Sequence, residues 1–134
     1  MTRVADVMTR QVVTVRGDAT LVEALTYLAT QHISGAAVTD HRQRLVGVVS
    51  RSDIIEAEVE VEEPEARGRF LTDTLVRDVM SSPALTVGPD VELREAALAM
   101  EYGDVHRLFV EEAGELVGVL SRSDVSRALA TGQA

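Results

Sequence analysis

The stretch LVGVVSRSD at residues 45–53 recurs as LVGVLSRSD at residues 116–124, with eight of the nine positions identical. Each copy begins with an apolar run rich in β-branched residues, which is typical of a buried strand. The run leads directly into Ser-Arg-Ser-Asp and then into a segment whose apolar residues recur with helical periodicity. We therefore expect each copy to be a strand that leads into the N-terminus of a helix.

The serine and the aspartate of each copy, Ser50 with Asp53 and Ser121 with Asp124, have two interpretations. As a capping box, their side chains would satisfy unpaired amide groups of the first helical turn. As a binding site, the same amides and the helix dipole would attract an anionic ligand. The residues alone leave both interpretations open.

Other motifs repeat in the same order in both halves of the chain. DVMT at residues 6–9 recurs as DVMS at residues 78–81, and LVEA at residues 21–24 recurs as LREA at residues 93–96. Thr20 and Glu23 form a further capping-box pattern. Periodicity and turn residues predict the order strand, helix, strand, strand, helix in each copy. The predicted elements are residues 12–15, 21–29, 33–39, 45–50 and 52 onward in the first copy, and residues 85–87, 93–100, 105–111, 115–120 and 123–129 in the second.

A unit as small as one copy leaves a large fraction of its surface exposed when it is alone. We therefore expect an α+β fold in which two β-α-β-β-α repeats pack sheet against sheet with pseudo-two-fold symmetry. This packing would form two similar clefts between the repeats, each at a strand-to-helix turn. The predicted boundaries are residues 1–57 for the first domain, 58–72 for an acidic linker and 73–131 for the second domain.

The linker region is strongly acidic, with glutamate at positions 56, 58, 60, 62, 63 and 65. Its alternation with valine imitates a strand, but the charge density and the position after a helix favour a frayed helix end or a mobile solvated segment. A role in metal binding or partner docking is the alternative, and no histidine or ligand spacing supports it.

Composition excludes several classes of function. The formal charge of −9 and the scarcity of aromatic residues argue against nucleic acid or an anionic membrane surface as the partner. The absence of cysteine excludes disulfides, thiol nucleophiles and thiolate metal sites. Because the sequence also lacks a catalytic motif and a metal-ligand spacing, we expect neither an enzyme nor a metal site. Without a signal peptide or a membrane span, the expected location is cytoplasmic.

The two β-α-β-β-α repeats, with Asp-Val-Met-(Thr/Ser) at their start and Gly-Val-(Val/Leu)-Ser-Arg-Ser-Asp near their end, resemble a tandem pair of cystathionine β-synthase (CBS) domains. The resemblance covers nearly the whole chain. It implies a regulatory module, often a disk-like homodimer, that binds AMP, ADP, ATP or S-adenosylmethionine as a regulatory ligand and signals occupancy to a partner protein. No other cofactor is implied.

The resemblance also implies roles for individual residues. Asp53 and Asp124 would hold ribose hydroxyls, and the serines of the motif would contact ribose or phosphate. Carboxylate and hydroxyl groups suit these contacts, since a carboxylate accepts hydrogen bonds from both vicinal hydroxyls. The implied ligand-binding residues are Ser50, Ser52, Asp53, Ala84, Val105 and His106 for one cleft, and Ser121, Ser123, Asp124, Val12, Ile33 and Ser34 for the other.

His106 and Arg107 resemble a His-Arg pair that nucleotide-sensing family members use on phosphate groups. An exposed pair at an interface is the alternative. The first copy has Ser34-Gly35 at these positions, so the two clefts are predicted to differ. Arg51 and Arg122 oppose the helix dipole, which hints at a nearby anion, although a solvated or ion-paired arginine is the simpler interpretation.

Two other functions remain open at this point. The chain would be a ligand-free homodimeric scaffold whose paired helices dock a partner if both Ser/Asp pairs acted only as caps. It would be an anion or metal sensor if the acidic linker bound the ion.

Overall fold

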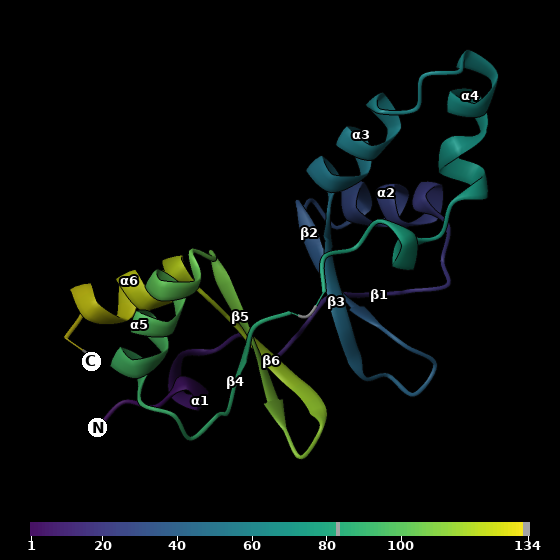
Figure 1. Ribbon diagram of the computed structural model, residues 1–134. Helices are drawn as coiled ribbons and strands as arrows, with labels where there is room; N and C mark the ends of the chain where they lie inside the picture. Colours follow the sequence, from purple (N-terminus) through teal and green to yellow (C-terminus); the bar gives the residue numbers. More distant parts are fainter. Residues whose placement is uncertain (83, 133–134) are drawn as a thin grey trace. The chain divides into compact units, whose positions relative to one another are not determined.

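The computed structural model describes residues 1–82 and 84–132 of the chain. The chain forms two compact units: a central unit, Val13–Ala84, and a terminal unit, in which Met1–Val12 joins Leu85–Ala134. Each unit contains a three-stranded sheet with helices packed on it (Figure 1). The predicted α+β fold with two similar halves is thus confirmed, and their sheet-against-sheet packing stays a prediction.

The central unit contains the strands and helices predicted for the first repeat, in the predicted order, followed by one further helix and a short 3₁₀ helix. Its strands follow the order β1-β2-β3, in which β1 and β2 are parallel and β2 and β3 are antiparallel. The elements are β1 (Thr14–Arg16), α2 (Leu21–Thr30), β2 (Gly35–Thr39), β3 (Leu45–Ser50), α3 (Arg51–Val59), α4 (Pro64–Asp73) and the short 3₁₀ helix η1 (Val76–Asp78).

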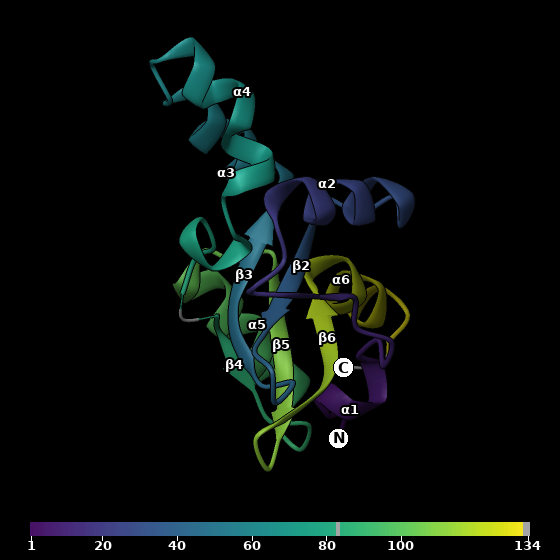
Figure 2. The same ribbon diagram turned by 90° about the vertical axis from the view of Figure 1, so that its right-hand side faces the viewer.

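The terminal unit repeats this arrangement with strand order β4-β5-β6, a parallel pair followed by an antiparallel pair. Figure 2 shows both sheets from a second direction. The elements are α1 (Val4–Val7), β4 (Thr86–Val87), α5 (Leu93–Gly103), β5 (Arg107–Glu112), β6 (Glu115–Ser121) and α6 (Arg122–Ala130).

Helix α2 shows how the sequence builds these elements. Thr20 Oγ1 accepts a hydrogen bond from the Glu23 amide at 3.2 Å, and the Thr20 amide donates to Glu23 Oε1 at 2.9 Å, which confirms the predicted capping box. The Thr20 amide also lowers the pKa of the Glu23 carboxyl. Leu21, Ala24 and Leu28 are buried on the predicted apolar face, whereas Ala29, expected on the same face, is exposed.

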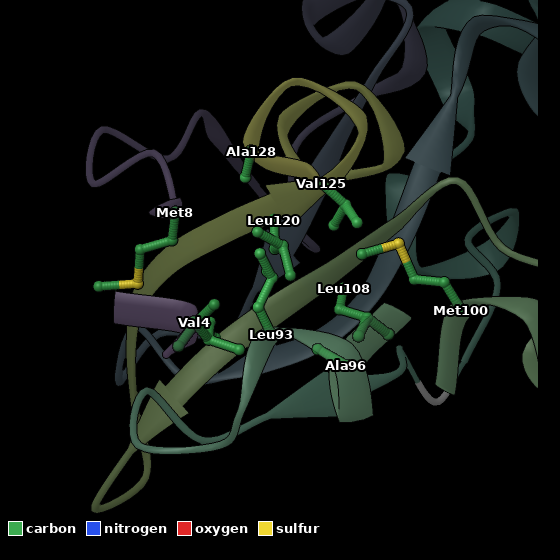
Figure 3. Close-up of a cluster of buried hydrophobic side chains, with 10 residues drawn as sticks. Val4, Met8, Leu93, Ala96, Met100, Leu108, Leu120, Val125 and Ala128 are labelled. Carbon is green, nitrogen blue, oxygen red and sulfur yellow. The ribbon is translucent and has the colours of Figure 1, made fainter. Parts of the chain in front are cut away.

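Each unit has its own hydrophobic core between its sheet and its helices. The terminal core is shown in Figure 3, where side chains from α1, α5, α6 and the sheet converge. Its members are Val4, Met8, Leu93, Ala96, Met100, Leu108, Val110, Leu120, Val125 and Ala128. The central core is built mostly from equivalent positions, and its members are Val15, Leu21, Ala24, Leu28, Ala36, Val38, Val49, Ile54 and Val76.

The segment that opens each repeat packs with the sheet of the other repeat. Thr9 pairs with Val119 through two backbone hydrogen bonds, both 2.9 Å long. Ser81 pairs with Val48 in the same way, at 2.8 and 2.9 Å. The compact units are therefore composed differently from the sequence repeats, because the two repeats exchange their opening segments.

Close approach of the exchanged segments explains the glycine of the repeated motif. A Cβ atom at Gly47 would lie 2.6 Å from the carbonyl oxygen of Ser81 and 2.8 Å from Met80 Sδ. A Cβ atom at Gly118 would lie 2.6 Å from Met8 Sδ and 3.0 Å from the carbonyl oxygen of Thr9. Only glycine leaves room for the opening segment to cross each strand at this distance.

The second half of the predicted linker forms a helix that the glutamate-rich pattern did not predict. Pro64 begins the helix α4, where its ring suits the first helical position. Arg67 Nε donates to the carbonyl oxygen of Val61 at 2.8 Å, and Phe70 and Leu71 pack against the central core. The glutamates at 56, 60, 62, 63 and 65 are exposed, as expected.

Replacing Gly47 by Ala should reduce the free energy of unfolding by about 1–3 kcal/mol, because the new methyl group overpacks against the backbone of Ser81. Gly68→Ala is the matched control. Gly68 lies within α4, and a methyl group there would meet no other atom within 4 Å, so alanine should add about 0.5–1 kcal/mol. Urea unfolding measures both changes, and a neutral Gly47→Ala would contradict the close approach.

Candidate functional site

The first candidate site is the turn from β3 into α3. Ser50 is the N-cap residue, and its Oγ accepts a hydrogen bond from the Asp53 amide at 3.0 Å. In return, the Ser50 amide donates to Asp53 Oδ2 at 3.2 Å. The capping interpretation is therefore confirmed for this turn. Within residues 1–82 and 84–132, Asp53 Oδ1 has no hydrogen-bond or ion-pair partner, so one carboxylate oxygen is not used by the cap.

The second candidate site, the turn from β6 into α6, has the same cap. Ser121 Oγ accepts from the Asp124 amide at 3.1 Å, and the Ser121 amide donates to Asp124 Oδ2 at 3.1 Å. Here the second carboxylate oxygen is also engaged, because Asp124 Oδ1 lies 3.7 Å from an Nη atom of Arg127. The sequence-based prediction missed this pair. The signal was available in the residue three positions after each aspartate, which is Glu56 in one copy and Arg127 in the other.

The start of the second strand of each unit lies beside its turn. The Arg51 amide donates to the carbonyl oxygen of Ser34 at 2.9 Å, and Gly35 is paired in register with Ser50. In the terminal unit, the Arg122 amide donates to the carbonyl oxygen of His106 at 2.9 Å, and Arg107 is paired with Ser121. Arg107 thus occupies the position that Gly35 has in the central unit.

Two other arginines near the second turn, Arg122 and Arg107, have different surroundings. Arg122 Nε donates to the carbonyl oxygen of Val105 at 2.8 Å, and its Nη2 lies 3.9 Å from Asp104 Oδ1. The ion-paired interpretation of Arg122 is confirmed. Arg107 is half-buried, and its guanidinium has no hydrogen-bond or ion-pair partner among the described residues. His106 is exposed just before β5.

The other predicted site residues divide between the two units. Ala84 lies in the central unit with the Ser50 turn, and Val12 lies in the terminal unit with the Ser121 turn. Both are half-buried. Ile33 and Val105 pack against the core of their own unit. Ser34 accepts a hydrogen bond from the Arg51 amide through its carbonyl oxygen. The assignment of Ile33-Ser34 to the Asp124 site and of Val105-His106 to the Asp53 site stays a prediction.

Each turn also leaves one amide for an external acceptor. In α3 the Arg51 amide donates to Ser34 and the Asp53 amide donates to Ser50, whereas no described acceptor takes the Ser52 amide. Ser123 is in the equivalent position in α6. Ser52 and Ser123 are both exposed. A small anion could therefore be bound at the first turn without breaking the cap.

Two further properties bear on the kind of site. In the part of the chain that the structure describes, no group of three or more His, Asp or Glu residues is placed to hold a metal ion. The helices of residues 1–82 and 84–132 lack the length and apolar character needed to cross a membrane.

Comparison with known proteins identifies the family. A model of the CBS domain matches residues 4–60 and again residues 76–131. The chain therefore belongs to the CBS domain family and carries the domain twice, as the repeated motifs predicted.

Relatives include proteins of several sizes. CBSX2 of Arabidopsis thaliana, solved in complex with AMP, is 28% identical, covers 100% of both chains and has a TM-score of 0.83. The protein MJ1232 of Methanocaldococcus jannaschii is 32% identical over 92% of this chain, which spans 38% of the relative. An inosine-5'-monophosphate dehydrogenase of Korarchaeum cryptofilum is 34% identical over 87% of this chain, which spans 22% of that enzyme.

Replacing Ser121 by Ala should reduce the free energy of unfolding by about 0.5–2 kcal/mol, because the Asp124 amide loses its acceptor. Ser123→Ala removes a hydroxyl from the same helical turn without removing the cap, and should change stability by about 0.5 kcal/mol or less. Chemical denaturation compares the two variants. Equal losses would contradict the capping role of Ser121.

Proposed function

We propose that this chain is a regulatory module that binds an adenosine-containing ligand at the Ser50–Asp53 and Ser121–Asp124 turns. The observation that carries the proposal is the Asp53 turn, where a half-buried carboxylate keeps Oδ1 unused and the neighbouring Ser52 amide has no acceptor among the described residues. The full-length likeness to CBSX2, which was solved with AMP, supports an adenine nucleotide as the ligand.

The chemistry of the turn fits a nucleotide. The carboxylate of Asp53 accepts hydrogen bonds from ribose hydroxyls, and the Ser52 amide, which has no acceptor among the described residues, donates to a phosphate oxygen. Beside the Ser121 turn, Arg107 is paired in register with Ser121, has no hydrogen-bond or ion-pair partner among the described residues, and supplies a guanidinium that can bind phosphate through two donors. Apolar side chains at Val12, Ile33, Ala84 and Val105 suit the adenine ring. AMP is the first candidate, with ADP, ATP and S-adenosylmethionine as alternatives.

The proposed role is regulation without catalysis. A ligand that binds one arrangement of the two domains more tightly than another shifts the population toward that arrangement. A partner protein then responds to the shift. We propose that the module acts as a cytoplasmic homodimer with no required cofactor, and that the regulated activity belongs to this partner.

A second candidate function, a docking scaffold, is favoured by a groove in the terminal unit. The groove lies between α5 and α6, has a volume of about 550 Å³ and includes exposed Leu98 and Leu129 in its lining.

Leu98→Glu should disrupt docking of another helix in this groove. Val22→Glu, at an exposed apolar position of α2 outside this groove, serves as the control. Sedimentation analysis measures the change in assembly, and an unchanged mass for Leu98→Glu would count against this scaffold function.

The test of the ligand proposal is calorimetric titration of the full chain with AMP, ATP and S-adenosylmethionine. At least one should bind, and the double variant Asp53→Asn/Asp124→Asn should weaken that binding at least about tenfold, because both ribose-binding carboxylates lose their charge. Asparagine retains a carbonyl oxygen for the cap, so folding is preserved.

Asp90→Asn is the matched control, since Asp90 is an exposed aspartate that belongs to neither turn. It should leave affinity unchanged. Absence of binding across the whole panel would overturn the nucleotide-binding proposal.

A further inference from the structure

The two turns have the same cap but different charges one helical turn further along the chain. Asp124 Oδ1 lies 3.7 Å from Arg127, and the Asp124 side chain is 14% exposed. The equivalent of Arg127 in the central unit is Glu56, which is exposed. Asp53 therefore has an acidic neighbour three residues away, where Asp124 has a basic one.

We infer that Arg127 makes Asp124 the weaker ribose acceptor, so that the Asp53 turn is the tighter nucleotide site. This inference rests on the proposed function, because it assigns unequal roles to the two turns of that function. It names Arg127 as a positioning residue that acts through the carboxylate of Asp124.

The physical reason is competition for one oxygen atom. In both turns Oδ2 already accepts the amide of the N-cap serine, so Oδ1 is the oxygen with more free acceptor capacity. At Asp124 the guanidinium of Arg127 is within ion-pair distance of Oδ1 and compensates part of its charge. A ribose hydroxyl must compete with this cation. At Asp53 it meets no such competitor among the described residues.

The size of the effect follows from the exposure of the pair. The Arg127 side chain is 72% exposed, so solvent screens the interaction. Exposed ion pairs contribute at most about 1 kcal/mol, which corresponds to a change in affinity of up to about fivefold. Calorimetry resolves a difference of this size when each site is measured separately.

Single-site variants of the full chain make that separation possible. Asp53→Asn leaves the Asp124 site, and Asp124→Asn leaves the Asp53 site, with both caps retained. With AMP as the probe, Asp124→Asn should bind more tightly than Asp53→Asn. Adding Arg127→Gln to Asp53→Asn should raise AMP affinity by up to about fivefold. Adding Arg127→Lys, which keeps the charge, should leave the affinity near that of Asp53→Asn alone.

Arg127→Gln added to Asp124→Asn is the matched control and should not change AMP affinity, because the carboxylate through which Arg127 acts is gone. Equal affinities of the two single-site variants, or unchanged or weaker binding after Arg127→Gln in the Asp53→Asn protein, would overturn the inference while leaving the proposed function in place. Failure of the unmodified chain to bind AMP would instead overturn AMP as the ligand and this inference with it.

Discussion

The exchange of opening segments is the constraint on which the rest of the structure depends. Two backbone hydrogen bonds join Ser81 to Val48, and two join Thr9 to Val119. Each pair places the start of one repeat against the last strand of the other. As a result, Val4 of the first repeat is buried in the terminal core and Val76 of the second repeat is buried in the central core. Neither repeat completes a core from its own residues.

This exchange gives the repeated motif its rigid geometry. The opening segment crosses β3 at Gly47 and β6 at Gly118, where a side chain would collide with it. A few residues later each strand ends at the serine that caps the following helix. Three neighbouring features thus position the proposed ligand-binding atoms: the glycine where the opening segment crosses, the end of the strand, and the serine that caps the helix. Rigid support of this kind keeps a binding carboxylate in one orientation.

The residues that cap the two helices are also the residues proposed to bind the ligand. The cap uses Oδ2 of each aspartate and leaves Oδ1, so the confirmed structural role and the proposed binding role are compatible. The copies differ in what surrounds that oxygen. Repetition of a motif in the sequence therefore does not make two equivalent sites, because long side chains one helical turn away decide the local charge.

The sequence by itself determined the order of strands and helices, the apolar face of α2 and the capped turns, because periodicity and capping act between residues close together in the chain. The repeat was enough to identify the CBS family. The helix α4 was missed because its stability comes from packing Phe70 and Leu71 on a distant core. The exchange of opening segments, the hydrogen bond of Arg122 to Val105 and the engagement of Asp124 by Arg127 were decided by the folded structure. Such contacts depend on which segments meet in space and how side chains are oriented there, and the pattern of residues along the chain does not contain that information.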